Sequence, residues 1–312
     1  MGKVQLPPGV QLSPDDRRNF TVGMFAKAPA AFPRKFSLAP LVKTKDQKMV
    51  SACVAGALAM LLEYQLMQLG VYVNLSMAYG YANREEDDWQ GSGMVPHEAL
   101  KLFQKDGCCL EEMFPGIADY SFLKSRITPE MRANALQYRI GPYYRVYTPA
   151  EIKTAIMTFM CPVLVVIPIS WEFMAYQGGK MPLPVFKEGE KKDYHAVLYI
   201  GWDDDTQDWE IQHSWPYWDG DGVGKLPYGY PWPEAWGVAH FTDPVSRKPA
   251  ERIELFAGQK RMRVNGKELM LDSVPRLVDG RLQFPLRHPF EAAGYYVEWI
   301  EAEQKMMALR QS

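Results

Sequence analysis

One uninterrupted apolar stretch constrains the fold more than any other part of this sequence. Residues 51–62 read SACVAGALAMLL, carry no charge, and are followed by good helix formers to about Gln68. This pattern predicts a helix over 51–68 that lies inside the protein, because it is apolar on most of its sides. The stretch ends at Glu63 and is therefore too short to cross a bilayer.

Cys53, at the start of this helix, is a candidate nucleophile. The thiolate is the reactive form of cysteine, and a helix N-terminus or a neighbouring imidazolium lowers the thiol pKa. His195, at the start of a strand-like segment, is the candidate imidazole, and Gln47 stands six positions before the thiol with an amide suited to an oxyanion. Each residue taken alone is usually structural. Together they predict acyl transfer through a covalent thioester.

Four blocks of sequence surround these residues in a fixed order. They are DQKMVSAC at 46–53, Leu75-Ser76 with Tyr79 and GSG at 91–93, YHAV at 194–197 followed by GWDD at 201–204, and QHSWPYWDGDGVG at 212–224. From about Phe32 to Tyr230 the chain resembles the papain-like cysteine proteases. The separation of about 140 residues between Cys53 and His195 fits that family, although Val54 replaces its usual aromatic residue after the thiol.

The resemblance implies a fold and a role for each matching residue. The fold would be α+β, with a helical lobe, a β-rich lobe and an active site in the cleft between them. Cys53 would be the nucleophile, and His195 the general base and then the acid. Gln47 and the Cys53 backbone N–H would form the oxyanion hole. Trp215 would shield the imidazole from water, and Gly93 would pair its backbone with an extended peptide.

His213 is the departure from the family that matters for the chemistry. The family has an asparagine there, which orients the catalytic imidazole. A neutral imidazole accepts the same hydrogen bond, whereas a protonated one repels His195 and no longer accepts. We therefore expect activity to fall at higher pH on the acid side than in a His213→Asn variant. The alternative is a degenerate, inactive site on a retained fold.

The remaining patterns predict further elements and an order of domains. Helices are expected at 96–105 and 151–159, strands at 162–168, 196–200 and 209–212, hairpin turns at 265–266 and 279–280, and a last helix at 289–293. Residues 1–34, rich in proline, are expected to form an extended arm over the surface, too short for a long inhibitory pro-segment. A peptidase domain would follow at 35–243, a linker at 244–250 and a small domain at 251–312.

The small domain resembles the N-terminal domain of copper amine oxidases. The matching residues are VNGK at 264–267, Asp272 with Pro275, DGR at 279–281, FPLR at 284–287, and FEAAG at 290–294 with Val297 and Trp299. The segment has one histidine and no cysteine, so we expect no copper site. No metal or cofactor is predicted for the chain. The resemblance implies a non-catalytic accessory module, often found on bacterial cell-surface proteins.

Composition excludes several other functions. The formal net charge is −2 without a basic stripe, so nucleic-acid binding is not expected. The first 30 residues lack an apolar core of signal-peptide length, which leaves the compartment open and makes a secreted, cell-surface or virion location an inference from the small domain alone. Four cysteines, two of them adjacent, predict no disulfide framework. The acidic runs at 203–205 and 219–222 are expected to be solvated turns.

Three hypotheses about function follow from the sequence. The first is a cysteine endopeptidase that acts on a polypeptide substrate. The second is a hydrolase that uses the same thiol chemistry on peptidoglycan peptides. The third is a catalytically inactive papain-like scaffold in a cell envelope, or in a virion if the chain is a phage product.

Overall fold

The computed structural model describes residues 9–239, apart from 17–18, 89–90, 92, 177 and 180, and the backbone of strands between 253 and 310. The chain divides into two compact units, Met1–Phe241 and Thr242–Ser312. The first unit contains every residue for which the sequence predicts chemistry.

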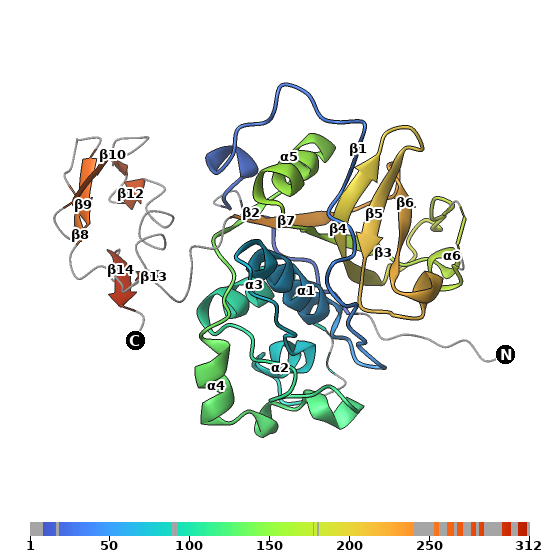
Figure 1. Cartoon of the computed structure of the whole chain (residues 1–312), viewed down its shortest axis with the longest axis horizontal. Helices are drawn as coiled ribbons and strands as arrows, with labels where there is room; N and C mark the ends of the chain where they lie inside the picture. The colour runs from blue at the N-terminus through green and yellow to red at the C-terminus, as the bar shows by residue number, and fades with distance from the viewer. Residues whose placement is uncertain are drawn as a thin grey trace. The chain divides into compact units, whose positions relative to one another are not determined.

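Helices dominate the first part of this unit (Figure 1). They are α1 (Cys53–Gln68), α2 (Met77–Ala82), α3 (Pro96–Lys105) and α4 (Pro129–Ala135), with short 3-10 helices η1 (Val22–Met24), η2 (Asp119–Phe122) and η3 (Lys124–Arg126). α3 and α4 begin with proline, which suits the first helical position. α1 begins two residues later than predicted, because Ala52 lies outside the helical conformation and offers no side-chain cap.

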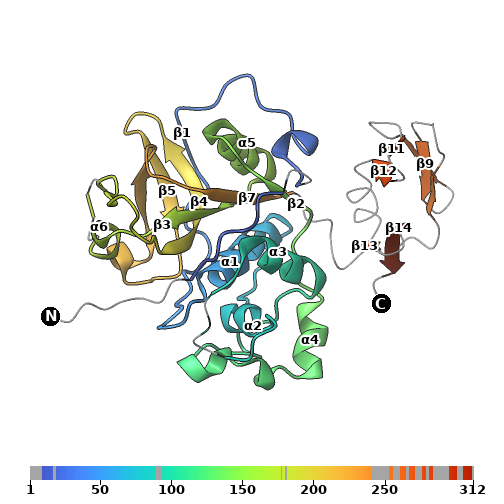
Figure 2. The same ribbon diagram turned by 180° about the vertical axis from the view of Figure 1, so that it is seen from behind.

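An antiparallel sheet forms the second part. Its strands are β1 (Lys35–Ser37), β2 (Tyr143–Arg145), β3 (Val163–Pro168), β4 (Tyr194–Asp203), β5 (Asp208–Gln212), β6 (Val223–Pro227) and β7 (Glu234–Val238). They lie in the order β2-β7-β3-β4-β5-β6, with β1 paired to β4. α5 (Pro149–Phe159), α6 (Trp171–Met174) and η4 (Trp218–Gly220) connect them. Figures 1 and 2 show α1 and α5 on opposite sides of β2 and β7. This arrangement confirms the predicted α+β class.

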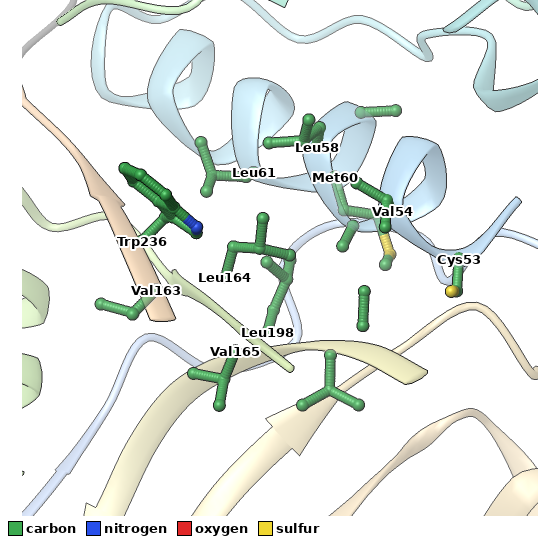
Figure 3. Close-up of a cluster of buried hydrophobic side chains, with 14 of the residues drawn as sticks. Cys53, Val54, Leu58, Met60, Leu61, Val163, Leu164, Val165, Leu198 and Trp236 are labelled. Carbon is green, nitrogen blue, oxygen red and sulfur yellow. The ribbon is translucent and has the colours of Figure 1, made fainter. Parts of the chain in front are cut away.

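The contact of α1 with β3 and β4 forms the centre of the core. Every residue of α1 from Cys53 to Leu66 is buried, and so is every residue of β3. Figure 3 shows Leu61 of α1 close to Leu164 of β3, with Leu198 of β4 beside it. Burial of each leucine side chain stabilises the folded state by about 1.5–3 kcal/mol relative to leaving it exposed to water. This packing therefore fixes the start of α1 close to β4.

The second unit is described through its strands. β8 (Ile253–Leu255), β9 (Arg261–Val264) and β10 (Lys267–Met270) form one sheet, β11 (Arg276–Val278) pairs with β12 (Arg281–Gln283), and β13 (Tyr295–Ile300) pairs with β14 (Lys305–Arg310). Val264 pairs with Lys267 and Val278 with Arg281. Both registers agree with the predicted hairpin turns. The predicted helix at 289–293 and the predicted linker lie outside the described residues.

A buried ion pair fixes the loop that precedes α1. The Lys45 ammonium donates to the Glu63 carboxylate of α1, to Asn74 Oδ1 at 2.7 Å and to the Leu75 carbonyl at 2.9 Å. Glu63 also accepts the Leu75 N–H at 2.6 Å. Gln47 follows Lys45 by two residues, so this anchor helps to determine where the Gln47 side chain lies.

Replacing Lys45 by methionine should strongly destabilise the protein. The change leaves the Glu63 carboxylate buried without its cation, which costs about 3–5 kcal/mol in free energy of unfolding. Urea unfolding measures the loss, and Lys45→Met/Glu63→Leu should recover most of it. The control is Lys101→Met, which breaks an exposed ion pair with Glu98 and should cost less than about 0.5 kcal/mol. Equal losses in Lys45→Met and Lys101→Met would contradict an anchoring role for Lys45.

Candidate active site

Cys53 and His195 both lie in the region where α1 begins beside β4. Cys53 is the first residue of α1, and His195 is the second residue of β4. The backbone N–H of Ala196, next to His195, is directed at the Cys53 sulfur, as are those of Val54 and Cys53 itself. The thiol thus lies at the junction of the helices and the sheet, next to the strand that carries the imidazole.

A hydrogen bond joins the two buried histidines. His195 Nε2 and His213 Nδ1 are 2.9 Å apart, and the ring planes are nearly perpendicular at 86°. Because Nε2 of His195 is engaged, its Nδ1 is the nitrogen left to exchange a proton with the thiol. Among the described residues, nothing bonds to the buried Nε2 of His213. The geometry suits His213 as the acceptor of an N–H from His195.

Aromatic rings enclose this histidine pair. Trp215 stacks on His195 with ring centroids 4.1 Å apart and planes at 20°. Trp218 meets the His213 ring edge-on at 4.7 Å, and Phe173 of α6 contacts both imidazoles. The rings exclude water from the bond between the histidines, which strengthens that bond.

The side-chain amide of Gln47 has a defined orientation. The Ser214 hydroxyl donates to Gln47 Oε1 at 2.6 Å, and Gln47 Nε2 donates to the Val50 carbonyl at 2.8 Å. A carbonyl oxygen only accepts, so the atom that faces Val50 must be the nitrogen. The Gln47 backbone N–H also donates to the Ser214 carbonyl at 3.1 Å. The amide nitrogen carries two hydrogens, which leaves one for a further acceptor.

Residues 9–13 of the chain itself form a segment whose first residue, Gly9, lies against the thiol. A Cβ atom added to Gly9 would overlap the Cys53 sulfur, and one added to Gly93 would overlap the Gly9 carbonyl. The two segments pair in parallel, since the Met94 N–H donates to the Gly9 carbonyl at 3.3 Å and the Gln11 N–H to the Met94 carbonyl at 3.2 Å. Gly93, with φ of 89°, therefore contacts an extended segment of the same chain.

Two further hydrogen bonds hold this segment. The Ser13 N–H donates to Glu234 Oε2 at 2.9 Å, and the Ser13 hydroxyl accepts the His97 N–H at 3.0 Å. Gly9 and Val10, in the segment for which the sequence predicts an extended arm, are buried. Proline and glycine content predicted an extended backbone but gave no information about which surface the backbone would cover.

Burial keeps both candidate catalytic groups neutral in this arrangement. It raises the pKa of the Cys53 thiol to about 12, against the opposing effect of the nearby backbone N–H groups. It lowers the pKa of His195 to about 3, and with the nearby His195 it holds the pKa of His213 well below its ordinary value. The covered thiol is therefore a poor nucleophile.

The sequence motifs around this site match one family over most of the first unit. The match is to the papain family of cysteine proteases and covers residues 31–229. The chain belongs to the papain family. It is a cysteine-type peptidase, a hydrolase whose substrate is a polypeptide. Residues 242–308 match the copper amine oxidase N-terminal domain. Both resemblances found in the sequence are thereby confirmed.

Solved structures of papain-like enzymes share the fold. Xylellain, a cysteine protease from Xylella fastidiosa, is 20% identical with a TM-score of 0.64, and the match covers 78% of this chain and 99% of xylellain. Digestive procathepsin L 3 of Tenebrio molitor larval midgut is 17% identical with a TM-score of 0.56, over 71% and 74% of the two chains. Bromelain from Ananas comosus is 17% identical with a TM-score of 0.53, over 67% and 100%. These matches confirm the two-lobed papain-like fold. No curated protein matches the chain.

Contacts connect the six residues predicted for the site. Cys53 lies beside Ala196, the neighbour of His195 in β4, and His195 contacts His213 and Trp215. Gln47 bonds to Ser214, between those two, and Gly93 reaches Cys53 through Gly9. Ser214, Trp218 and Phe173 complete the site without having been assigned a role. Ser214 and Trp218 belong to the motif at 212–224, so the sequence could have indicated that they lie at the site. Phe173 lies outside every motif.

Other candidate sites carry less chemistry. In the part of the chain that the structure describes, no three His, Cys, Asp or Glu side chains gather as a metal site requires. No described helix is long and apolar enough to span a membrane. The carboxylates at 203–205 form ion pairs with Arg34, Lys35 and Lys153.

Replacing Gly9 by alanine should uncover the thiol. Overpacking of this kind costs about 1–3 kcal/mol, so the population with an open cleft should rise about 5- to 150-fold. The rate at which iodoacetamide alkylates Cys53 in the native full chain, followed by mass spectrometry, should rise by the same factor.

Gly23→Ala is the matched control, because nothing lies within 4 Å of a Cβ added at Gly23. Its alkylation rate should equal that of the wild type. An unchanged rate in Gly9→Ala would show that residues 9–13 do not cover the thiol in solution.

Proposed function

We propose that the chain is a cysteine endopeptidase that hydrolyses peptide bonds through a thioester on Cys53. The observation that carries this proposal is the 2.9 Å contact between His195 Nε2 and His213 Nδ1. His195 belongs to β4, the strand that lies beside the thiol. A nucleophile, a base and a third group that orients the base are the parts that covalent catalysis requires. Gln47 adds a side-chain donor for the oxyanion.

Acylation begins in an open cleft. The proton of the Cys53 thiol moves to His195 Nδ1, and the sulfur attacks the carbonyl carbon of the scissile bond. The carbonyl oxygen takes the negative charge and accepts hydrogen bonds from Gln47 Nε2 and the Cys53 backbone N–H. The C–N bond then breaks, and the leaving amine takes the proton from His195. The other N–H of the imidazolium donates to His213.

Deacylation uses the same groups, with His195 now acting first as a base toward water. His195 removes a proton from water, and the resulting hydroxide attacks the thioester carbon. The C–S bond breaks, the product leaves as a carboxylic acid, and His195 returns its proton to the sulfur, which restores the thiol. Trp215, stacked on His195, limits the access of other water to the imidazole.

Residues 9–13 support the proposal that this arrangement is a latent form. Gly9 touches the sulfur, yet its carbonyl is engaged by the Met94 N–H rather than by Gln47. The bond between Gly9 and Val10 is thus not presented for attack. The segment acts as a cover instead of a substrate, and it must leave before a substrate enters.

Hydrolysis of a fluorescently labelled denatured protein tests the proposed function. In both the wild-type and the Gly9→Ala chain, Cys53→Ala and His195→Ala should each lower turnover by about 10³-fold or more. Cys161→Ala is the matched control, since it removes another buried free thiol of the core and should leave turnover nearly unchanged.

Two results would favour the other hypotheses. Release of peptides from purified peptidoglycan, without cleavage of the denatured protein, would indicate the peptidoglycan hydrolase. An uncovered Cys53 that cleaves neither substrate and is alkylated no faster than an ordinary thiol would indicate an inactive scaffold.

The pH dependence of activity should report on His213. Burial lowers the pKa of His213, so the ring is neutral and accepts a hydrogen bond near pH 7. Acid eventually protonates it and removes the acceptor, whereas asparagine does not titrate. The acid limb of kcat/KM in the wild type should therefore lie at higher pH than in His213→Asn, and below the ordinary histidine pKa of about 6.5.

Profiles measured from about pH 4 to 8 decide this point, with His213→Ala as the reference that lacks any acceptor. His213→Ala should be slower than both other proteins across the whole range. Coincident acid limbs in the wild type and His213→Asn would contradict the role given to His213.

A further inference from the structure

We propose that Arg84 is a positioning residue that holds the cleft edge, defined here as Gly93 and Met94. The cover segment, residues 9–13, pairs with this edge through its backbone. Under the proposed function, on which this part of the inference rests, a peptide substrate pairs with the same edge once the cover has left. The basis is a chain of contacts that runs from Arg84 through one carboxylate to Gly91.

The guanidinium of Arg84 has a fixed place at the end of α2. It lies over the Tyr81 ring, 3.7 Å from the ring centroid, and its Nη1 donates to the Tyr81 carbonyl at 3.0 Å. The Lys124 ammonium donates to the Arg84 carbonyl at 2.8 Å and so holds the backbone as well. Arg84 is only 6% exposed. A planar group that is stacked, bonded and buried keeps one orientation.

Asp88 connects this guanidinium to the loop that leads to the cleft. Arg84 Nη2 donates to Asp88 Oδ1 at 2.5 Å and also to the Asp88 carbonyl. The same Oδ1 accepts the Gly91 N–H at 2.7 Å. Hydrogen bonds to ionised groups are stronger than neutral ones. One carboxylate oxygen therefore ties the backbone at Gly91 to the buried arginine.

Gly91 lies directly against the pair of charged groups. A Cβ atom added there would overlap Arg84 Nη2 and would lie 2.7 Å from Asp88 Oδ1. Glycine is thus needed at this position for the close approach of its backbone. Gly93 follows two residues later, and two residues of chain span at most about 7 Å. The place of Gly91 therefore limits where Gly93 lies.

The cleft edge lies between two anchors. After Met94, the chain enters α3 at Pro96. All four cysteines are free thiols, so no disulfide fastens the edge. The Arg84 contacts supply the anchor that precedes it. With both ends held, the N–H and carbonyl of Met94 keep the spacing that an extended chain needs for pairing.

Alkylation of the latent wild-type chain tests the anchor without any need for catalysis. Asp88→Ala and Arg84→Met should each loosen the edge and weaken its pairing with the cover. The rate at which iodoacetamide alkylates Cys53, followed by mass spectrometry, should rise about tenfold, the lower end of what loss of a hydrogen bond to a charged group costs. The Asp88 side chain is 57% exposed, so its replacement should leave the fold intact.

Hydrolysis of a fluorogenic peptide tests the same anchor in the full chain that carries Gly9→Ala. Asp88→Ala should raise KM about tenfold and leave kcat unchanged, because pairing with the edge binds the substrate and its transition state equally. The alkylation rate in this uncovered background should not change, since iodoacetamide does not pair with the edge.

Glu86→Ala is the matched control. Its carboxylate lies 3.5 Å from Arg84 Nε and its side chain is 55% exposed, close to the value for Asp88. It faces the same guanidinium from the side away from Gly91's bond to Asp88, and its loss should change neither KM nor the alkylation rate. Arg84→Met/Asp88→Ala should be no worse than either single variant, because both interrupt one chain of contacts.

Three outcomes would overturn the inference. They are an unchanged alkylation rate of latent Asp88→Ala, an equal effect of Glu86→Ala and Asp88→Ala, and a fall in kcat of Asp88→Ala at constant KM. A different result would count against the proposed function alone. In that case the Gly9→Ala chain would cleave no peptide, while Asp88→Ala would still speed alkylation of the latent chain and Glu86→Ala would not.

Discussion

The packing of α1 on β3 and β4 is the contact on which the chemistry depends. α1 is buried on all sides, so its position is fixed along its length and not only at one face. Its first residue, Cys53, is thereby held beside Ala196, which follows His195 at the start of β4. The helix contributes backbone N–H groups to the sulfur, and the sheet contributes the imidazole. A shift of α1 by one turn, about 5.4 Å, would separate the two groups.

Burial has two opposite effects at this site. It excludes water from the His195–His213 hydrogen bond and from the Gln47 amide, and so preserves their geometry. It also raises the pKa of the thiol and lowers that of the imidazole, which disfavours the charged pair that catalysis needs. Gly9 adds to the second effect, because its backbone lies against the sulfur. Under the proposed function, opening of the cleft would raise the reactivity of the thiol without any change in the groups themselves.

Much of the fold and of the candidate site could be predicted from the sequence, because each motif that carries the chemistry is one unbroken stretch of residues. Short local patterns are enough to predict the helix at Cys53, the strand at His195 and the block around His213. The resemblance to the family then predicts which of these segments contact one another. Phe173 and the pairing of Gly9 with Met94 depend instead on contacts between distant segments that no local pattern encodes. The orientation of the Gln47 amide likewise requires the positions of Val50 and Ser214 in space.

The most direct measurement is a crystal structure of the full chain after reaction with a peptidyl epoxide that alkylates thiols. The account predicts a bond from Cys53 Sγ to the inhibitor, with its peptide in the place of residues 9–11 and paired to the Met94 backbone. It also predicts that His195 remains in contact with His213. An unmodified Cys53 with residues 9–13 still in place, or an inhibitor bound to a different cysteine, would contradict the account.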